Sequence, residues 1–178
     1  MENDKLIRSI STSAGDKGKS QNYSKEILPK TDLLFEALGS MDELSSFLGL
    51  TYHYSKVEEL LAIQRILQTI NSLMATNASS DPERYARLTK VTQADIDWIE
   101  SIGEAMLQKQ PLEPCFVLPG SETSLAGAYF DVARATSRRC ERAIIRFVED
   151  RKRTDLEIPL VFLNRLSDLL FLFARQSH

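Results

Sequence analysis

The amino-acid sequence predicts an all-α protein, a bundle of four to five helices. Apolar residues recur at spacings of three and four over several long segments, which is the period of an amphipathic helix. Short connections rich in proline, glycine and small polar residues separate these segments and favour antiparallel neighbours. An apolar content of 43% over 178 residues is enough for one hydrophobic core. We therefore expect a single helical domain over residues 1–178.

The first 30 residues have no sustained period of 2 or 3.6 and are expected to form an extended, mobile arm. Within the arm, the segment 12–20 contains Gly15 and Gly18, and Lys30 closes the arm. Glycines let backbone N–H groups approach a phosphate closely, and lysines add positive charge. A Gly-x-x-Gly segment is on its own more often a plain turn, so both interpretations stay open at this point.

Two amphipathic helices are predicted after the arm. The first covers about 32–54, and Asp42 and Glu43 point away from its apolar stripe. Without further context these two carboxylates are solvated surface. The second helix covers about 56–77 and has a broad apolar face. Small polar residues and Pro82 then favour a loop.

A third helix is predicted to begin at Thr92 and to run to about residue 109. Asp95 stands at the capping-box position that Glu usually takes. Prolines then stop this helix, and the short apolar connection 116–120 leads to the next one. Phe116 in this connection would most simply be a core residue.

The next predicted helix contains the segment 132–142 and has two different faces. At about 100° per residue, one face carries clustered charges and the other carries mainly apolar side chains. Clustered guanidinium groups match the geometry of phosphate oxygens, although such a face is more often solvated surface with i,i+4 pairs. The charged face comprises Arg134, Arg138, Glu141 and Arg142, and the opposite face comprises Tyr129, Val132, Thr136, Cys140, Ala143 and Phe147.

The last predicted helix covers about 159–175. Its apolar stripe faces the core, and Asn164 lies on its polar face. The simplest interpretation of this polar face is again solvated surface.

Charge and hydropathy exclude two classes of partner. The chain has 22 basic and 25 acidic residues, a net charge of −3, and no basic tail, so general affinity for nucleic acid is not expected. No apolar run approaches the roughly 20 residues that cross a bilayer, and the first residues lack the pattern of a signal peptide. We therefore expect a cytoplasmic protein with no membrane partner.

Cysteine and histidine usage argues against a resident metal cluster. Cys115 and Cys140 are too few for a disulfide framework and do not have a zinc-site spacing. Neither His53 nor His178 stands in a Glu-x-x-His pattern, so the di-iron chemistry of some helical bundles has no ligands. Both thiols are expected to be reduced.

Four stretches of the chain carry a resemblance to a known family: 36–44, 116–120, 132–142 and 162–171. In that order and at those separations they closely resemble the ATP:corrinoid adenosyltransferases of the propanediol-utilisation (PduO) type, over nearly the whole chain. The resemblance implies a homotrimer with active sites between subunits. It also implies the reaction, an attack of cob(I)alamin on the 5′ carbon of ATP that gives adenosylcobalamin and triphosphate.

The resemblance also assigns roles to individual residues. The expected catalytic residues are Arg138, Phe116, Asp42 and Arg134, and Asp42 pairs with Arg134 of a neighbouring subunit. Phe116 protrudes into the corrinoid site and displaces the lower axial ligand. The expected binding residues for ATP and its phosphates are Thr12, Gly15, Asp16, Gly18, Lys30, Arg138, Glu141 and Asn164. Glu141 is the expected contact for Mg²⁺ bound with the ATP phosphates.

The segment 12–20 departs from the family pattern at three positions. Ser13 stands where a basic residue is expected, Ala14 where threonine or glycine is expected, and Lys19 where threonine is expected. An alternative function is therefore a non-catalytic paralogue that binds the nucleotide or the corrinoid for delivery or sensing. A purely structural bundle is the third alternative. Beyond ATP and cobalamin, the expected partners are a flavin-dependent reductase and a B12-dependent enzyme.

Overall fold

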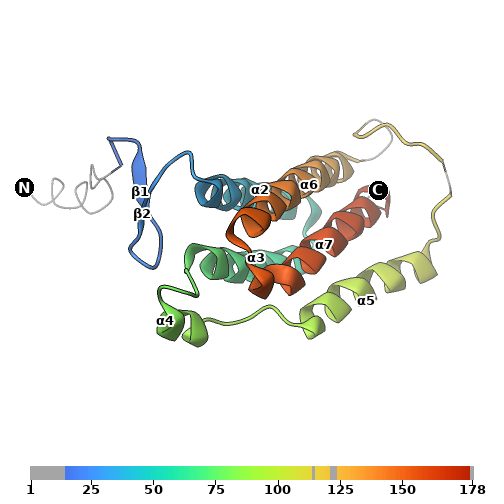
Figure 1. Cartoon of the computed structure of the whole chain (residues 1–178). Helices are drawn as coiled ribbons and strands as arrows, with labels where there is room; N and C mark the ends of the chain where they lie inside the picture. The colour runs from blue at the N-terminus through green and yellow to red at the C-terminus, as the bar shows by residue number, and fades with distance from the viewer. Residues whose placement is uncertain (1–14, 114, 121–123, 177–178) are drawn as a thin grey trace, which may run out of the picture.

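The computed structural model describes residues 15–113, 115–120 and 124–176, and it confirms the all-α prediction. Most of the described chain lies in five long helices (Figure 1). The four helices with predicted bounds agree with the structure to within one turn, and the predicted helical segment 132–142 lies inside the longest one. No helix in these described ranges is long and apolar enough to cross a membrane. The long helices are α2 (Leu33–Ser55), α3 (Glu59–Ala75), α5 (Gln93–Lys109), α6 (Leu125–Arg151) and α7 (Glu157–Gln176).

Local sequence signals explain where the helices begin. Asp32 caps α2 by accepting a hydrogen bond from the Leu34 N–H at 2.9 Å. Ser124 caps α6 by accepting a hydrogen bond from the Gly127 N–H at 3.2 Å. The predicted capping box of α5 is confirmed, because the Thr92 N–H donates to Asp95 at 2.8 Å. Each such cap satisfies N–H groups that have no partner within the helix.

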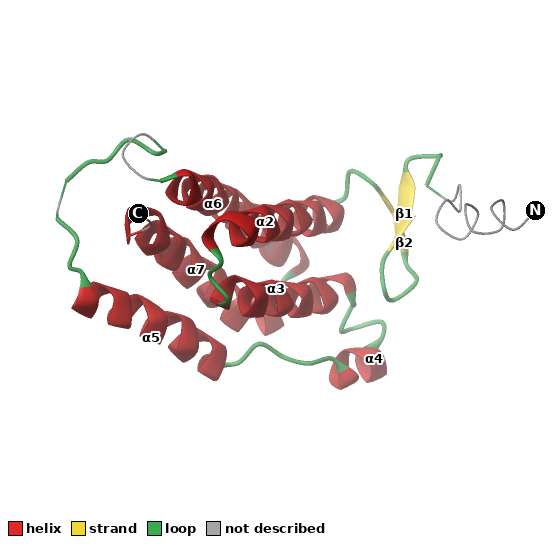
Figure 2. Ribbon diagram, turned by 180° about the vertical axis from the view of Figure 1, so that it is seen from behind, coloured by secondary structure: helices red, strands yellow, loops and turns green. Residues whose placement is uncertain are grey.

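α6 is the central helix of the bundle. It packs against α2 on one side and against α7 on the other, while α3 packs on α2 and α5 packs on α7 (Figure 2). The buried side chains of all five long helices form one cluster, in which Phe130 of α6 stacks on Phe173 of α7 with ring centroids 5.0 Å apart. Burial of each large apolar side chain contributes about 1.5–3 kcal/mol. This core fixes which face of α6 points outward.

The buried face of α6 differs from the predicted one at two positions. Val132 was expected to face the core but is 43% exposed, and Tyr129 is only half-buried. Because α6 is covered by α2 and α7, its buried arc centres on Phe130, Ala133 and Ser137, and Val132 lies about 100° away from the middle of that arc. The other four predicted core positions of this helix are buried: Thr136, Cys140, Ala143 and Phe147.

The arm contains a hairpin that the sequence analysis did not predict. β1 (Lys19–Gln21) pairs antiparallel with β2 (Ile27–Pro29), with Ser20 opposite Leu28. Strands of three residues are too short to show a period of 2. The hairpin lies at the end of the bundle where α2 begins and α6 ends (Figure 1).

A short helix, α4 (Pro82–Arg87), follows the predicted loop, and a 3₁₀ turn, η1 (Thr154–Leu156), precedes α7. The sequence analysis missed α4, because it has six residues and no buried side chain that would reveal a period. Its start is nevertheless marked in the sequence: Asp81 caps it and Pro82 occupies the first turn.

Candidate active site

The outer face of α6 carries an exposed guanidinium and a carboxylate that contacts α7. Arg138 is exposed, and its side chain has no hydrogen-bond or ion-pair partner among the described residues. Glu141, one turn along, is half-buried and accepts a hydrogen bond from Asn164 Nδ2 of α7 at 3.1 Å. The Asn164 side-chain oxygen accepts from Arg165 at 2.9 Å. The structure therefore brings three predicted site residues onto neighbouring faces and fixes the Asn164 amide at both ends.

Arg165 and its partner were not assigned a role by the sequence analysis. The Arg165 Nε donates to the Glu100 carboxylate of α5 at 2.6 Å. Both side chains are partly exposed. Glu100 thus holds the Arg165 side chain that donates to the Asn164 amide. No local pattern in the sequence could reveal this contact, because Glu100 lies on a different helix.

A buried carboxylate near the start of α6 was also missed. Asp131 is 5% exposed and forms an ion pair with Arg175 of α7, which is 6% exposed. Its Oδ2 atom also accepts a hydrogen bond from the Gly120 N–H at 2.9 Å. Charged groups are rarely this buried unless they are paired. Asp131 therefore joins α6, α7 and the connection that carries Phe116.

Arg134 lies next to this buried pair, on the same helix as Asp131. Its Nε is 4.0 Å from Asp131 Oδ1, which is too long for a hydrogen bond. Within the described residues this buried Nε has no hydrogen-bond partner. The predicted pairing of Arg134 with Asp42 of a neighbouring subunit stays a prediction.

Asp42 is exposed on α2 and borders a groove between α2 and α3. The groove has a volume of about 360 Å³. Glu43, the next residue, instead pairs with Arg139 of α6, and the hydrogen bond raises the pKa of the Arg139 guanidinium. Arg139 is thus engaged within its own chain, unlike Arg138. The groove is lined by Tyr23, Phe35, Leu38, Gly39, Asp42, Gln68, Asn71 and Ala75.

The arm places its predicted phosphate contacts close to one another. The Gly18 N–H donates to the Gly15 carbonyl at 3.2 Å, and Gly18 has a positive φ of 71°, which suits glycine. The Lys30 N–H donates to the Gly18 carbonyl at 2.8 Å. A Cβ added to Gly15 would lie 2.9 Å from Lys30 Nζ, so the ammonium group covers this glycine. Asp16 is exposed beside them.

Thr12, Ser13 and Ala14 lie outside the described residues. Lys19 is described and begins β1, where it is exposed opposite Pro29.

Phe116 is not a core residue of the single chain. Its side chain is 87% exposed, and Leu118 beside it is 58% exposed. The connection turns back into α6 through Gly120, whose φ of 75° favours glycine. The alternative interpretation of Phe116 as core is therefore wrong for this chain, and an apolar ring is presented outward.

Within one chain the predicted site residues fall into separate places. The arm lies at the C-terminal end of α6, and the Phe116 connection lies at its N-terminal end (Figure 1). α6 has 27 residues and is therefore about 40 Å long. The described residues contain no group of three or more His, Cys, Asp or Glu that could hold a metal ion.

The structure is thus a helical bundle with an exposed guanidinium, Arg138, on its central helix, a glycine segment beside Lys30 in the arm, and an exposed aromatic ring, Phe116. The model of the cobalamin adenosyltransferase family matches residues 10–177. The chain therefore belongs to the cobalamin adenosyltransferase family.

Curated relatives and solved structures agree with this assignment. The chain is 36% identical over 177 residues to the corrinoid adenosyltransferase MMAB of Mus musculus, with 96% of this chain and 73% of the relative covered. It is 34% identical over 168 residues to a corrinoid adenosyltransferase of Citrobacter freundii, with 93% of each covered.

Two structures of a PduO-type ATP:corrinoid adenosyltransferase from Lactobacillus reuteri are also similar. One is a phenylalanine-to-alanine variant complexed with cobalamin and ATP, with a TM-score of 0.81 and 34% identity. The alignment covers 93% of this chain and 91% of that chain. The other is an arginine-to-lysine variant complexed with ATP, with a TM-score of 0.78, 32% identity, and 92% and 91% covered.

Proposed function

We propose that this chain transfers the 5′-deoxyadenosyl group of ATP to cob(I)alamin and releases triphosphate. The observation that carries the proposal is Arg138, an exposed guanidinium on the central helix beside the fixed Glu141–Asn164 pair. Family membership supplies the reaction type. Similar solved structures contain cobalamin and ATP, and they were made as variants of a phenylalanine and of an arginine, the residue types of Phe116 and Arg138.

The proposed chemistry is one displacement at carbon. The cobalt lone pair of cob(I)alamin forms the Co–C bond to the 5′ carbon, and the electron pair of the broken C–O bond leaves with triphosphate. The leaving group gains charge, so positioned cations stabilise the transition state. Arg138 can grip phosphate oxygens in a bidentate way, and Lys30 adds a point charge. Asn164, held at both ends, orients the nucleotide.

Glu141 fits the role of a carboxylate contact for Mg²⁺ bound to ATP. One of its oxygens accepts from Asn164, and the other has no partner among the described residues. Mg²⁺ usually keeps several waters and binds through one or two carboxylates together with substrate phosphates. The chain would thus need to offer only this carboxylate, and the cation would neutralise phosphate charge.

Phe116 has the proposed task of excluding the lower axial ligand of the corrinoid. Its exposed ring can cover one apolar face of a bound corrin, and the buried pair behind Gly120 holds the connection in place. A Co(II) centre without an axial donor is easier to reduce, because no ligand raises the orbital that accepts the electron. The electron itself comes from a reductase, and a flavin-dependent reductase stays the predicted one. A B12-dependent enzyme as partner and a cytoplasmic location also stay predictions.

The active site is proposed to form between subunits of a homotrimer. The arm and Phe116 are separated by the length of α6, about 40 Å, so residues of two chains are a simpler source for one compact site. The buried Arg134 Nε without an acceptor among the described residues fits an acceptor on a neighbouring chain, and the exposed Asp42 is the proposed one. Sedimentation of the wild type together with Asp42→Asn and Arg134→Ala tests this, and a monomeric wild type would end the proposal.

One assay tests the activity. Purified protein, ATP, Mg²⁺ and chemically reduced cobalamin should give the absorbance change of adenosylation. Binding of ATP and cobalamin without turnover would instead identify a non-catalytic paralogue. Failure to bind ATP would leave only a structural bundle.

A further inference from the structure

The hairpin of the arm is too small to hold its own shape. β1 and β2 have three residues each, and most of their side chains are exposed. An isolated two-stranded hairpin is marginally stable at best in water. Something outside the hairpin must therefore fix the segment that carries Gly15, Gly18 and Lys30.

The turn of the hairpin is anchored to the end of α3. The Tyr23 N–H donates to the Ala75 carbonyl at 2.9 Å, and the Asn77 N–H donates to Ser24 Oγ at 2.9 Å. Asn22 at the start of the turn is buried. These contacts tie the turn to the last residue of α3 and to Asn77, just beyond the helix.

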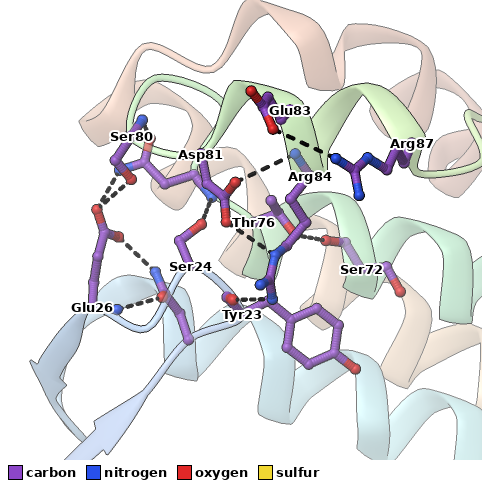
Figure 3. A network of polar contacts seen from close by, with 12 residues as sticks. Tyr23, Ser24, Glu26, Ser72, Thr76, Ser80, Asp81, Glu83, Arg84 and Arg87 are labelled. Carbon is purple, nitrogen blue, oxygen red and sulfur yellow. Dashed lines mark hydrogen bonds and ion pairs between the residues drawn. The ribbon is translucent and has the colours of Figure 1, made fainter.

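A carboxylate in the same turn collects three neutral donors. Glu26 accepts hydrogen bonds from Asn22 Nδ2 at 2.6 Å, from Asn77 Nδ2 at 2.7 Å and from Ser80 Oγ at 2.8 Å. Hydrogen bonds to a charged group are about twice as strong as neutral ones. Glu26 therefore links the two sides of the hairpin turn with the loop between α3 and α4 (Figure 3).

α4 completes the contact from outside. It buries no side chain, yet Arg84 donates to the Tyr23 carbonyl at 2.6 Å and pairs with Asp81 at 2.9 Å (Figure 3). On its other side, Tyr85 donates to Asp155 in η1. α4 is thus fixed to the bundle at one point and holds the hairpin turn at another.

We propose that Asn77, Ser80 and Arg84 form a brace, and that Glu26 and Arg84 are positioning residues for ATP binding. The inference rests on the proposed function, in which the arm contacts the phosphates of ATP. The pairing of β1 with β2 connects the anchored turn to the other end of the hairpin, where the Lys30 N–H donates to the Gly18 carbonyl. Ordering the arm before ATP arrives lowers the entropy that binding must otherwise remove.

The chain supplies a matched control on the same helix. Arg87 belongs to α4 as Arg84 does, but it pairs with Glu83 of the same helix at 3.5 Å, and its side chain is 79% exposed. Arg84→Ala removes the donor to the Tyr23 carbonyl, whereas Arg87→Ala leaves every contact with the hairpin intact. Glu26→Gln is a second variant that keeps the size of the side chain and removes its charge.

The experiment compares these variants with the wild-type chain in amide hydrogen exchange and in steady-state kinetics. In Arg84→Ala and Glu26→Gln, exchange over residues 19–30 should accelerate while residues 33–55 are unchanged. The KM for ATP should rise by about three- to tenfold, the effect of one lost net hydrogen bond. The kcat and the KM for cobalamin should stay within about twofold, the range of a change remote from the chemistry. Arg87→Ala should match the wild type.

Each outcome decides the proposal. Unchanged exchange over residues 19–30 in both variants would overturn the brace. Faster exchange with an unchanged KM for ATP would overturn the positioning role. Hydrogen exchange needs neither ATP nor cobalamin, so a wild type that fails to turn over would reject the proposed function while the exchange comparison still reports on the brace.

Discussion

The two segments with proposed binding residues, the arm and the connection that carries Phe116, lie at opposite ends of the bundle and are held by different contacts. The hairpin turn of the arm is held by hydrogen bonds spread over Glu26, Asn77, Ser80 and Arg84, on a partly exposed surface. The connection that carries Phe116 is held through Gly120 by one carboxylate, Asp131, inside the protein.

The difference predicts how each segment responds to change. Distributed contacts at a surface are individually worth little, so the arm should loosen in small steps. A buried ion pair is more sensitive, because removal of one partner leaves the other charge buried with neither an ion-pair partner nor water around it. A single substitution in the buried pair should therefore release the connection that carries Phe116, whereas single substitutions around the arm should each loosen it only slightly.

The largest expected effect is on the buried pair. Asp131→Ala should lower the free energy of unfolding by about 3–5 kcal/mol, because the Arg175 guanidinium is left buried and unpaired. Urea unfolding measures this. Replacing both residues, Asp131→Leu with Arg175→Met, should recover much of the loss. A loss below about 1 kcal/mol, the value of an exposed pair, would show that the pair does not hold this end.

The second effect distinguishes the role of the Phe116 ring from that of the Asp131–Arg175 pair that holds its connection. Phe116→Ala should leave the thermal midpoint unchanged because the ring is 87% exposed. With Co(II) as the starting state, activity should fall by roughly 100-fold, the order that loss of precise positioning costs. Absorbance and electron paramagnetic resonance spectra should show mostly five-coordinate Co(II). Unchanged four-coordinate Co(II) would refute the role of the ring.

The long helices could be predicted from the sequence because each one repeats its apolar pattern over several turns. The hairpin and α4 could not, since segments of three and six residues are shorter than any reliable period. Val132 was misplaced because the position of the buried arc depends on the packing of α2 and α7 against α6, which periodicity leaves open.

The candidate site was predicted in its residue types more than in its contacts. Arg138, Glu141 and Asn164 were assigned through resemblance, and the structure adds that Asn164 donates to Glu141. Asp131 and Arg175 were missed because they are 44 residues apart, and no local pattern marks such a pair. An aspartate between two apolar residues in a helix was the one available signal.

A third effect concerns the charged face between the two ends. Arg138→Lys keeps the charge and loses the bidentate geometry, so kcat/KM for ATP should fall at least about tenfold, or roughly 1.4 kcal/mol. The thermal midpoint and cobalamin affinity should stay close to the wild type because the side chain is exposed. Arg139→Lys is the neighbouring control, since Arg139 pairs with Glu43 in its own chain. If both variants kept wild-type ATP kinetics, the face would be solvated surface.

The smallest expected effect is a pH dependence confined to the arm. Burial opposes ionisation of Glu26, but hydrogen bonds from Ser80, Asn22 and Asn77 and the charge of Arg151 outweigh it, so the pKa of the carboxyl lies below its usual 4.5. A carboxyl whose pKa is lowered by folding contributes stability above its unfolded pKa and loses it as the pH falls through the folded pKa.

Protection of the arm amides should therefore be constant from neutral pH down to about 5 and should decline below about 4.5, by no more than roughly 1 kcal/mol for a half-exposed group. Amide protection factors corrected for intrinsic exchange measure this over residues 19–30. Glu26→Gln should start with lower protection and lose most of this decline. The pKa of Asp155 is also lowered, from its usual 3.8, because Arg153 and Tyr85 outweigh its burial, so protonation of Asp155 can loosen α4 below about 3.8. The decline that remains in Glu26→Gln reports that second contact, and a decline as large as in the wild type would show that Glu26 does not hold the turn.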